Sequence, residues 1–106
     1  MEYLNRIELR GIVGRVSIRQ IGNISLAELS LMTDYAYRDS SGNGVIETTW
    51  FSITAFEGKK ICQLERLEKG ITVYVVGRLR IRRYTGADGS ERSLPEIVAH
   101  EIRMER

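Results

Sequence analysis

A row of arginines that ends in an aromatic residue is the part of the sequence whose residue types and spacing could do chemistry. Residues 77–89 read GRLRIRRYTGADG. At the two-residue period of a β-strand, one side of this stretch carries Arg78, Arg80, Arg82 and Tyr84. Guanidinium groups bind phosphate through paired hydrogen bonds and stack on flat rings, and three of them cannot be buried together without partners. The pattern therefore predicts a face that meets solvent or anions.

The stretch 45–56, VIETTWFSITAF, carries a second candidate surface. One face holds Trp50, Ser52, Thr54 and Phe56, and the other holds Phe51, Ile53 and Ala55. From this strand alone two assignments are open: either Phe51 belongs to the core and Trp50 is exposed, or the reverse. If the Trp50 face adjoins the arginine row, basic groups alternate with exposed rings. Such a surface binds single-stranded nucleic acid, because the backbone follows the charges and unpaired bases stack on the rings.

Period-two patterns dominate the chain and predict five strands. They cover residues 5–16, 24–37, 45–56, 71–83 and 94–104. In the fourth of these strands, Leu79 and Ile81 are assigned to the core side, opposite the arginines. Turn residues in RDSSGNG (38–44) and TGADGS (85–90) predict two hairpin tips.

Residues 58–69, GKKICQLERLEK, break this alternation. Ile61, Leu64 and Leu67 recur at every third position among charged residues, which predicts a short amphipathic α-helix that ends at Gly70. Three strands, a helix and two strands follow one another in the order of an OB-fold. We therefore expect an all-β fold, a five-stranded β-barrel with one short α-helix between its third and fourth strands.

Length and composition predict one folded domain over residues 1–106. The chain is 42% hydrophobic with one proline, and its net charge is only +2. Of its 16 basic residues three are lysines, at 59, 60 and 69, which leaves 13 arginines. A single cysteine, Cys62, excludes an internal disulfide and fits a reducing compartment. The sequence has no apolar run of ~18–20 residues and no secretory signal pattern, so we expect a cytoplasmic protein without a membrane partner.

Catalytic and metal chemistry find little support in the sequence. DSSGNG (39–44) has the oxygen-bearing residues of a calcium loop, but its twelfth position is Trp50 and strands are predicted on both sides. HExxH, CxxC and GxxxxGK[ST] patterns are absent. A nuclease would need clustered carboxylates, and the acids near the proposed surface, Asp34, Asp39 and Glu47, surround a hairpin tip. We therefore expect no metal, no cofactor and no enzymatic activity.

The run EKGITVYVVGRLRIRRYTGADG (68–89) resembles the bacterial single-stranded DNA-binding protein family in its fourth strand and the hairpin that follows. The similarity extends to NRIELRG near the start, TTWFSITAF in the third strand and PEIVAHEI near the end. These motifs are specific when taken together and weak singly. They cover the chain from Asn5 to about Ile102.

The resemblance implies a homo-oligomeric OB-fold, a homotetramer with a dimer as the alternative, that coats single-stranded DNA during replication, repair and recombination. Members of the family stack bases on aromatic residues at four places. By motif these fall on Tyr37, Trp50, Phe56 and Tyr84, with Tyr at two places where better-known members carry Trp. The phosphate contacts are expected from Arg6, Arg38, Arg78, Arg80 and Arg82.

Two departures from the family pattern stand out. Phe51 takes a position near the subunit contacts that is often His, which bears on the details of the tetramer. The family also continues into a flexible linker and an acidic tip, whereas this sequence ends MER. We therefore expect a short form, natural or trimmed, that does not recruit repair proteins through a tail. A rival hypothesis is an interaction module similar to primosomal replication protein N, a short, dimeric, tailless OB-fold that bridges replication-restart proteins.

Overall fold

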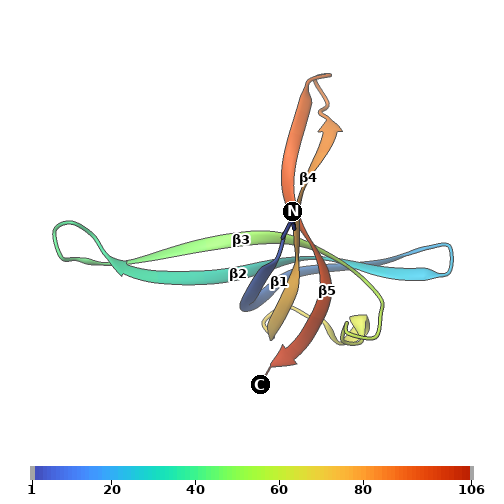
Figure 1. The fold of residues 1–106 in the computed structure, drawn as a ribbon, viewed down its shortest axis with the longest axis horizontal. Coiled ribbons are helices and arrows are strands. Elements are labelled where there is room, and N and C mark those ends of the chain that lie inside the picture. The colour runs from blue at the N-terminus through green and yellow to red at the C-terminus, as the bar shows by residue number, and fades with distance from the viewer. Residues whose placement is uncertain (1, 106) are drawn as a thin grey trace.

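The computed structural model describes residues 2–105. The elements are β1 (Ile7–Ile21), β2 (Ile24–Arg38), β3 (Gly44–Phe56), the 3₁₀ turn η1 (Leu64–Arg66), β4 (Thr72–Thr85) and β5 (Glu91–Glu105). The strands close a barrel in the order β1-β2-β3-β5-β4, in which β3 and β5 run parallel and all other neighbours are antiparallel (Figure 1). The predicted five-stranded OB-fold barrel is confirmed.

The core is built from the inward residues of all five strands. Its members include Val13, Leu29, Leu31, Ile53, Ala55, Val73, Val75, Ile97 and Ile102. On β3 these are the residues that alternate with Trp50, Ser52 and Thr54, as the two-residue period requires. The alternation therefore places one face of β3 inside the barrel and leaves the other outside.

Three hairpins extend beyond the barrel as two-stranded arms that point in different directions (Figure 1). The β1–β2 arm turns at Gly22, whose φ of 60° needs a residue without a Cβ. In the β2–β3 tip, Oδ1 of Asp39 accepts hydrogen bonds from the backbone N–H groups of Ser41 and Asn43, both at 2.9 Å. This Asx turn gives the DSSGNG segment a structural role. The β2–β3 and β4–β5 tips lie where the turn residues predict them.

The helix predicted over residues 58–69 is wrong in type and length, because the structure has only η1 there. Ile61 forms a parallel bridge with Ile102, and the backbone of Lys60 and Cys62 exchanges hydrogen bonds with Ile102. These contacts use the donors and acceptors that an α-helix would need. The three-residue spacing still buries Leu64 and Leu67, because side chains three apart eclipse one another in a 3₁₀ turn.

The assignment of Leu79 and Ile81 to the barrel is also wrong, since their side chains are 44% and 54% exposed. β1 pairs with β4 only as far as Gly77, whereas β4 and β5 stay paired out to Thr85. Beyond Gly77 β4 has no β1 neighbour, and its side chains from Arg78 to Thr85 are all exposed. An apolar alternation in this segment does not lead to burial.

Candidate nucleic-acid interface

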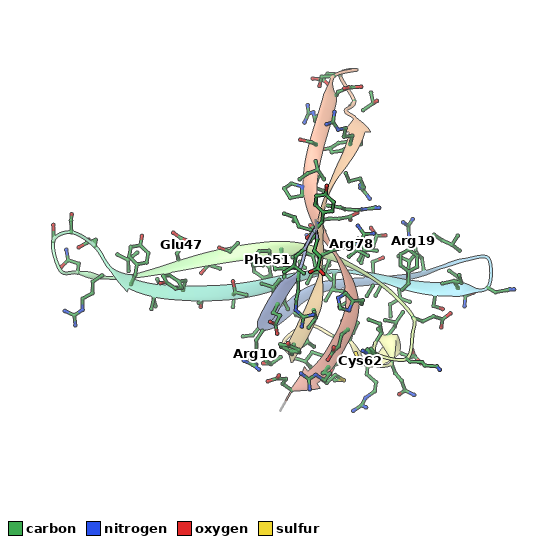
Figure 2. The ribbon with its side chains drawn as sticks, in the orientation of Figure 1. Arg10, Arg19, Glu47, Phe51, Cys62 and Arg78 are labelled. Carbon is green, nitrogen blue, oxygen red and sulfur yellow. The ribbon has the colours of Figure 1, made fainter. Side chains whose placement is uncertain are left out.

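The outer face of β3 carries two large exposed rings. Trp50 is 58% exposed and Phe56 is 45% exposed, with Ser52 and Thr54 between them on the same face. Phe51, on the other face, is half-buried and packs against the core, near the point where the arms meet (Figure 2). Of the two assignments that the sequence left open, the structure therefore has the one with Phe51 inward and Trp50 outward.

Trp50 lies directly on the backbone of β1. A Cβ atom added to Gly14 would be 2.5 Å from Cζ3 of Trp50 and 2.7 Å from Oγ of Ser30. The register of β1 against β2 shifts between Val13 and Val16, so Gly14 falls in an irregular stretch of the strand. Because glycine has no side chain, the indole can approach the backbone of β1 at Gly14 this closely.

A polar chain connects β3 to β4 across β5, which lies between them. Oγ1 of Thr54 donates a hydrogen bond to Oε2 of Glu96 at 3.1 Å, and Nε of Arg80 donates to Oε1 of Glu96 at 2.5 Å. Among residues 2–105, Glu96 is the one buried charged residue, and it contacts both partners while almost shielded from solvent. The Trp50 face and the arginine row are therefore parts of one surface, joined by a carboxylate of β5.

Two other arginines border a groove on this surface. The groove has a volume of ≈ 380 Å³ and is lined by Arg15, Ser17, Glu28, Leu29, Ser30, Ser52, Ile53, Thr54, Arg82, Leu94 and Glu96. Arg15 comes from β1 and Arg82 from the β4–β5 arm. Within residues 2–105, no carboxylate forms an ion pair with Arg15, Arg78 or Arg82. The groove is thus flanked by two cations that are not neutralised by the fold.

The remaining predicted residues are spread over the arms and the start of the chain. Tyr37 is exposed on the β2–β3 arm beside Tyr35, with 6.1 Å between the ring centroids, and Arg38 ends β2 on the same arm. Tyr84 is exposed on the β4–β5 arm. Arg6 precedes β1, and its Nε is 3.9 Å from a carboxylate oxygen of Glu8. The structure therefore places Trp50, Phe56 and Arg80 on the outer surface of the barrel, lets Arg82 reach the groove from the β4–β5 arm, and keeps Tyr37 and Tyr84 on separate arms.

Sequence reasoning misses the contribution of β1 and of the facing part of β2. Arg15, Ser17, Glu28 and Ser30 all line the groove, and Gly14 supports Trp50. A signal is present in the sequence, because residues 15, 17 and 19 alternate with Val16 and Ile18. The prediction does not use it, because the expected first strand stops at residue 16, whereas β1 continues to Ile21.

On the barrel part of β1, β4 and β5, the outer face carries charged residues that pair with one another. Arg10 and Arg103 lie over the ring of Tyr74, with the guanidinium carbons 5.5 Å and 4.6 Å from its centroid. Arg10 pairs with Glu105 at 2.9 Å, which raises the pKa of Arg10, and Arg103 pairs with Glu101 at 3.1 Å. The Tyr74 hydroxyl donates to Glu8, and this bond raises the pKa of Tyr74. The basic residues of this face are therefore already paired, unlike those of the groove.

The described part of the chain has neither a cluster of metal ligands nor a membrane-spanning helix. Among residues 2–105, no three His, Cys, Asp or Glu side chains gather closely enough to hold a metal ion. Over the same residues, no helix is long and apolar enough to cross a membrane. Cys62 is half-buried, and burial raises the pKa of its thiol.

Comparison with known proteins gives consistent matches in sequence. The model of the "Single-strand binding protein family" matches residues 4–105. The single-stranded DNA-binding protein of Neisseria meningitidis serogroup A is 35% identical over 105 residues, which are 95% of this chain and 59% of that protein. The protein of the same name from Xanthomonas campestris is 35% identical over 104 residues, covering 95% and 60% of the two chains. This chain therefore spans about three fifths of the length of these two relatives.

The fold is also shared with solved structures. A complex of Plasmodium falciparum SSB with ssDNA superposes with a TM-score of 0.84 at 24% identity, over 100% of this chain and 98% of the other. A deletion mutant of the single-stranded DNA binding protein from Thermus aquaticus has a TM-score of 0.78 at 27% identity, over 97% of this chain and 51% of the other. A closed barrel with an aromatic and basic outer face and a family match along nearly the whole chain lead to one conclusion: the chain belongs to the single-strand binding protein family.

Proposed function

We propose that the protein coats single-stranded DNA of any sequence during replication, repair and recombination, as a homo-oligomeric binding protein of the cytoplasm and not as an enzyme. Unpaired bases stack on Trp50 and Phe56 along β3, while Tyr37 and Tyr84 on the arms offer further rings. Arg78 and Arg82 contact the phosphates. Arg6 and Arg38 add positive charge at the start of β1 and at the end of β2.

One observation carries the proposal. Trp50 and Phe56 are exposed on the same face of β3, and β5 joins this face to Arg80 through Glu96. Exposed rings cost free energy in water unless a partner covers them, and a base covers a ring with ~1–3 kcal/mol of stacking. Unpaired arginines beside the rings supply the attraction that the phosphate backbone needs.

A titration with poly(dT) tests the proposal. Trp50 is the one tryptophan of the chain, so its fluorescence reports on a single site. Stacking of a base on the indole is expected to quench the emission, and added salt should reverse the quenching because phosphate contacts release counterions. Unchanged emission together with no binding of a labelled oligonucleotide would exclude the proposal. Double-stranded DNA of the same length is the control, because its bases are not free to stack.

A further inference from the structure

The groove lies between the two rings of β3. Trp50, Ser52, Thr54 and Phe56 share one face of the strand, and residues on one face follow each other at ~6.8 Å, twice the rise of an antiparallel strand. Two positions, Ser52 and Thr54, therefore separate the rings. A DNA strand that stacks a base on each ring must carry other bases over these two positions, where the groove opens.

The groove crosses the strands in the order β1-β2-β3-β5-β4; we call its residues on the two outermost strands, β1 and β4, the walls, and its residues on β2, β3 and β5 the floor. The charges differ between the two. Arg15 and Arg82 stand on the walls without an ion-pair partner within residues 2–105. The floor holds two carboxylates, Glu28 and Glu96, and hydroxyl groups. Phosphates are attracted to the unpaired arginines of the walls, whereas each floor carboxylate is paired with an arginine, so the floor adds no net attraction. A strand in the groove therefore turns its bases, and not its backbone, toward the floor.

Only one of the two floor carboxylates is exposed enough to accept a hydrogen bond from a ligand, because the Glu96 side chain is 5% exposed. Both oxygens of Glu96 are used, one by Arg80 and one by Thr54. Glu28 lies directly opposite Thr54 in the β2–β3 ladder, and its Oε1 pairs with Nε of Arg19 at 3.0 Å. Among the described residues, Oε2 of Glu28 has no hydrogen-bond partner. Its side chain is 39% exposed, so a ligand in the groove can reach it.

An ionised carboxylate only accepts hydrogen bonds, so it discriminates between bases. The exocyclic amino group of cytosine donates to a carboxylate, whereas uracil and thymine present a carbonyl oxygen at the same position. The floor hydroxyls of Ser30, Ser52 and Thr54 both donate and accept, so they accommodate any base. Glu28 is therefore the group on the floor that favours one base edge over another.

We propose that this groove is a base subsite in which Glu28 accepts a hydrogen bond from an exocyclic amino group, so that cytosine is held more tightly than uracil or thymine. The inference rests on the proposed function and sharpens it. General coating of DNA comes from the rings and the arginines, and the subsite adds a base preference. Arg15 and Arg82 hold the phosphates on either side of the selected base.

The test compares short oligo(dC) with short oligo(dU) at neutral pH. These strands differ only at the Watson–Crick edge of the base, since uracil lacks the methyl group of thymine. Affinities are measured by anisotropy of a labelled strand for the wild-type protein and for Glu28→Gln. The quantity compared is the ratio of dissociation constants, dU over dC. Removal of one negative charge raises the affinity for both strands alike, and the ratio cancels that effect.

The ratio is expected to fall about fivefold in Glu28→Gln, because a neutral amide accepts a weaker hydrogen bond than a carboxylate and its NH₂ group can donate to uracil. Glu65→Gln is the matched control, since Glu65 lies in η1 outside the groove and its substitution removes the same charge. The ratio measured for Glu65→Gln should equal the wild-type ratio. Glu28→Ala removes the acceptor completely and should also lower the ratio.

The outcomes separate the subsite from the general function. If both strands bind tightly to the wild type and to both Glu28 variants with one common ratio, the subsite is excluded and the coating function stands. If the wild type binds neither strand, the proposed function fails and the subsite with it. A fall of the ratio in both Glu28 variants, but not in Glu65→Gln, supports the subsite.

Discussion

Nε of Arg80 lies 2.5 Å from Oε1 of Glu96, a carboxylate that is only 4% exposed in the fold. Because of this ion pair, the arginines of the row on β4 do not all have the same role. Arg80, although it alternates with Arg78 and Arg82, is held by the protein itself. Its guanidinium compensates a buried charge, so its contribution to DNA binding comes from the N–H groups that Glu96 does not use.

Arg80→Ala is expected to lower the free energy of unfolding by about 1–3 kcal/mol, because it leaves the Glu96 carboxylate buried with one oxygen unpaired. Arg78→Ala, at a neighbouring exposed position, should change it by no more than about 0.5 kcal/mol. Urea denaturation measures the free energy of unfolding of both variants. Equal stabilities for the two variants would contradict the structural role of Arg80.

Arg15→Ala and Arg82→Ala are expected to weaken binding of single-stranded DNA while leaving the protein as stable as before. Each variant removes a cation that no carboxylate of residues 2–105 pairs with. In a plot of log affinity against log salt concentration, the slope should become shallower by about 0.7 for each phosphate that the variant no longer binds. Lys69→Ala, beyond η1, is the control and should leave the slope unchanged. An unaltered slope in Arg15→Ala would exclude β1 from the interface.

Gly14→Ala is expected to displace the indole of Trp50, because the new Cβ would lie 2.5 Å from Cζ3. The fluorescence emission of the free protein should shift, and the dissociation constant for poly(dT) should rise about fivefold or more as stacking weakens. Gly44→Ala is the matched control, since no atom lies within 4 Å of its added Cβ. The same emission from both variants would show that Gly14 does not position Trp50.

Trp50→Ala and Phe51→Ala are expected to have opposite effects, although the residues are adjacent. Phe51→Ala should lower the free energy of unfolding by about 2 kcal/mol, less than a fully buried Phe because its ring is half-buried. Trp50→Ala should instead weaken DNA binding by about 10- to 100-fold, because a base can no longer stack on the indole. Denaturation and anisotropy of a labelled strand measure the two effects. An unfolded Trp50→Ala variant would overturn the assignment of the faces.

The tip of the β4–β5 arm should loosen in acid. Oδ1 of Asp88 accepts hydrogen bonds from Oγ of Ser90 at 2.6 Å and from its backbone N–H at 3.0 Å, and these bonds lower the pKa of Asp88. Their stabilisation is complete above the pKa of the unfolded chain and is lost as the pH falls through the lower pKa of the folded state.

NMR of the Ser90 amide measures this transition. Its chemical shift should titrate with a midpoint below about 3.9, the ordinary value for Asp. In Asp88→Asn the transition should disappear. A midpoint at or above the ordinary value would contradict the hydrogen bonds of the tip.

The sequence predicts the barrel, the faces of β3 and the tips of two arms, because these depend on local rules. Side chains alternate along a strand wherever it lies, so Trp50 and Phe51 fall on opposite faces in any strand that contains them. Asp39 and Gly42 favour a turn through their own conformational preferences. Such features need no knowledge of which strands become neighbours.

A local sequence pattern predicts the wrong structure where contacts with distant parts of the chain determine secondary structure or burial. The spacing of Ile61, Leu64 and Leu67 suits an α-helix, but the bridge from Ile61 to Ile102 takes the backbone groups that a helix would use. Leu79 and Ile81 alternate like core residues, yet they lie beyond the last residue of β4 that β1 covers. Both errors concern partners that are remote in sequence.

The sequence alone determined the residue types, the arginine row and the alternation that puts Trp50 and Phe56 on one face of β3 and Phe51 on the other. Which of these two faces is exposed was decided by the closed barrel. The tertiary structure decided that β5 runs between β3 and β4, which places Glu96 under Arg80, and that β1 brings Gly14 and Arg15 to the same surface. The physical reason is that alternation is a property of each strand, whereas the order of strands follows from pairing and closure of the whole barrel.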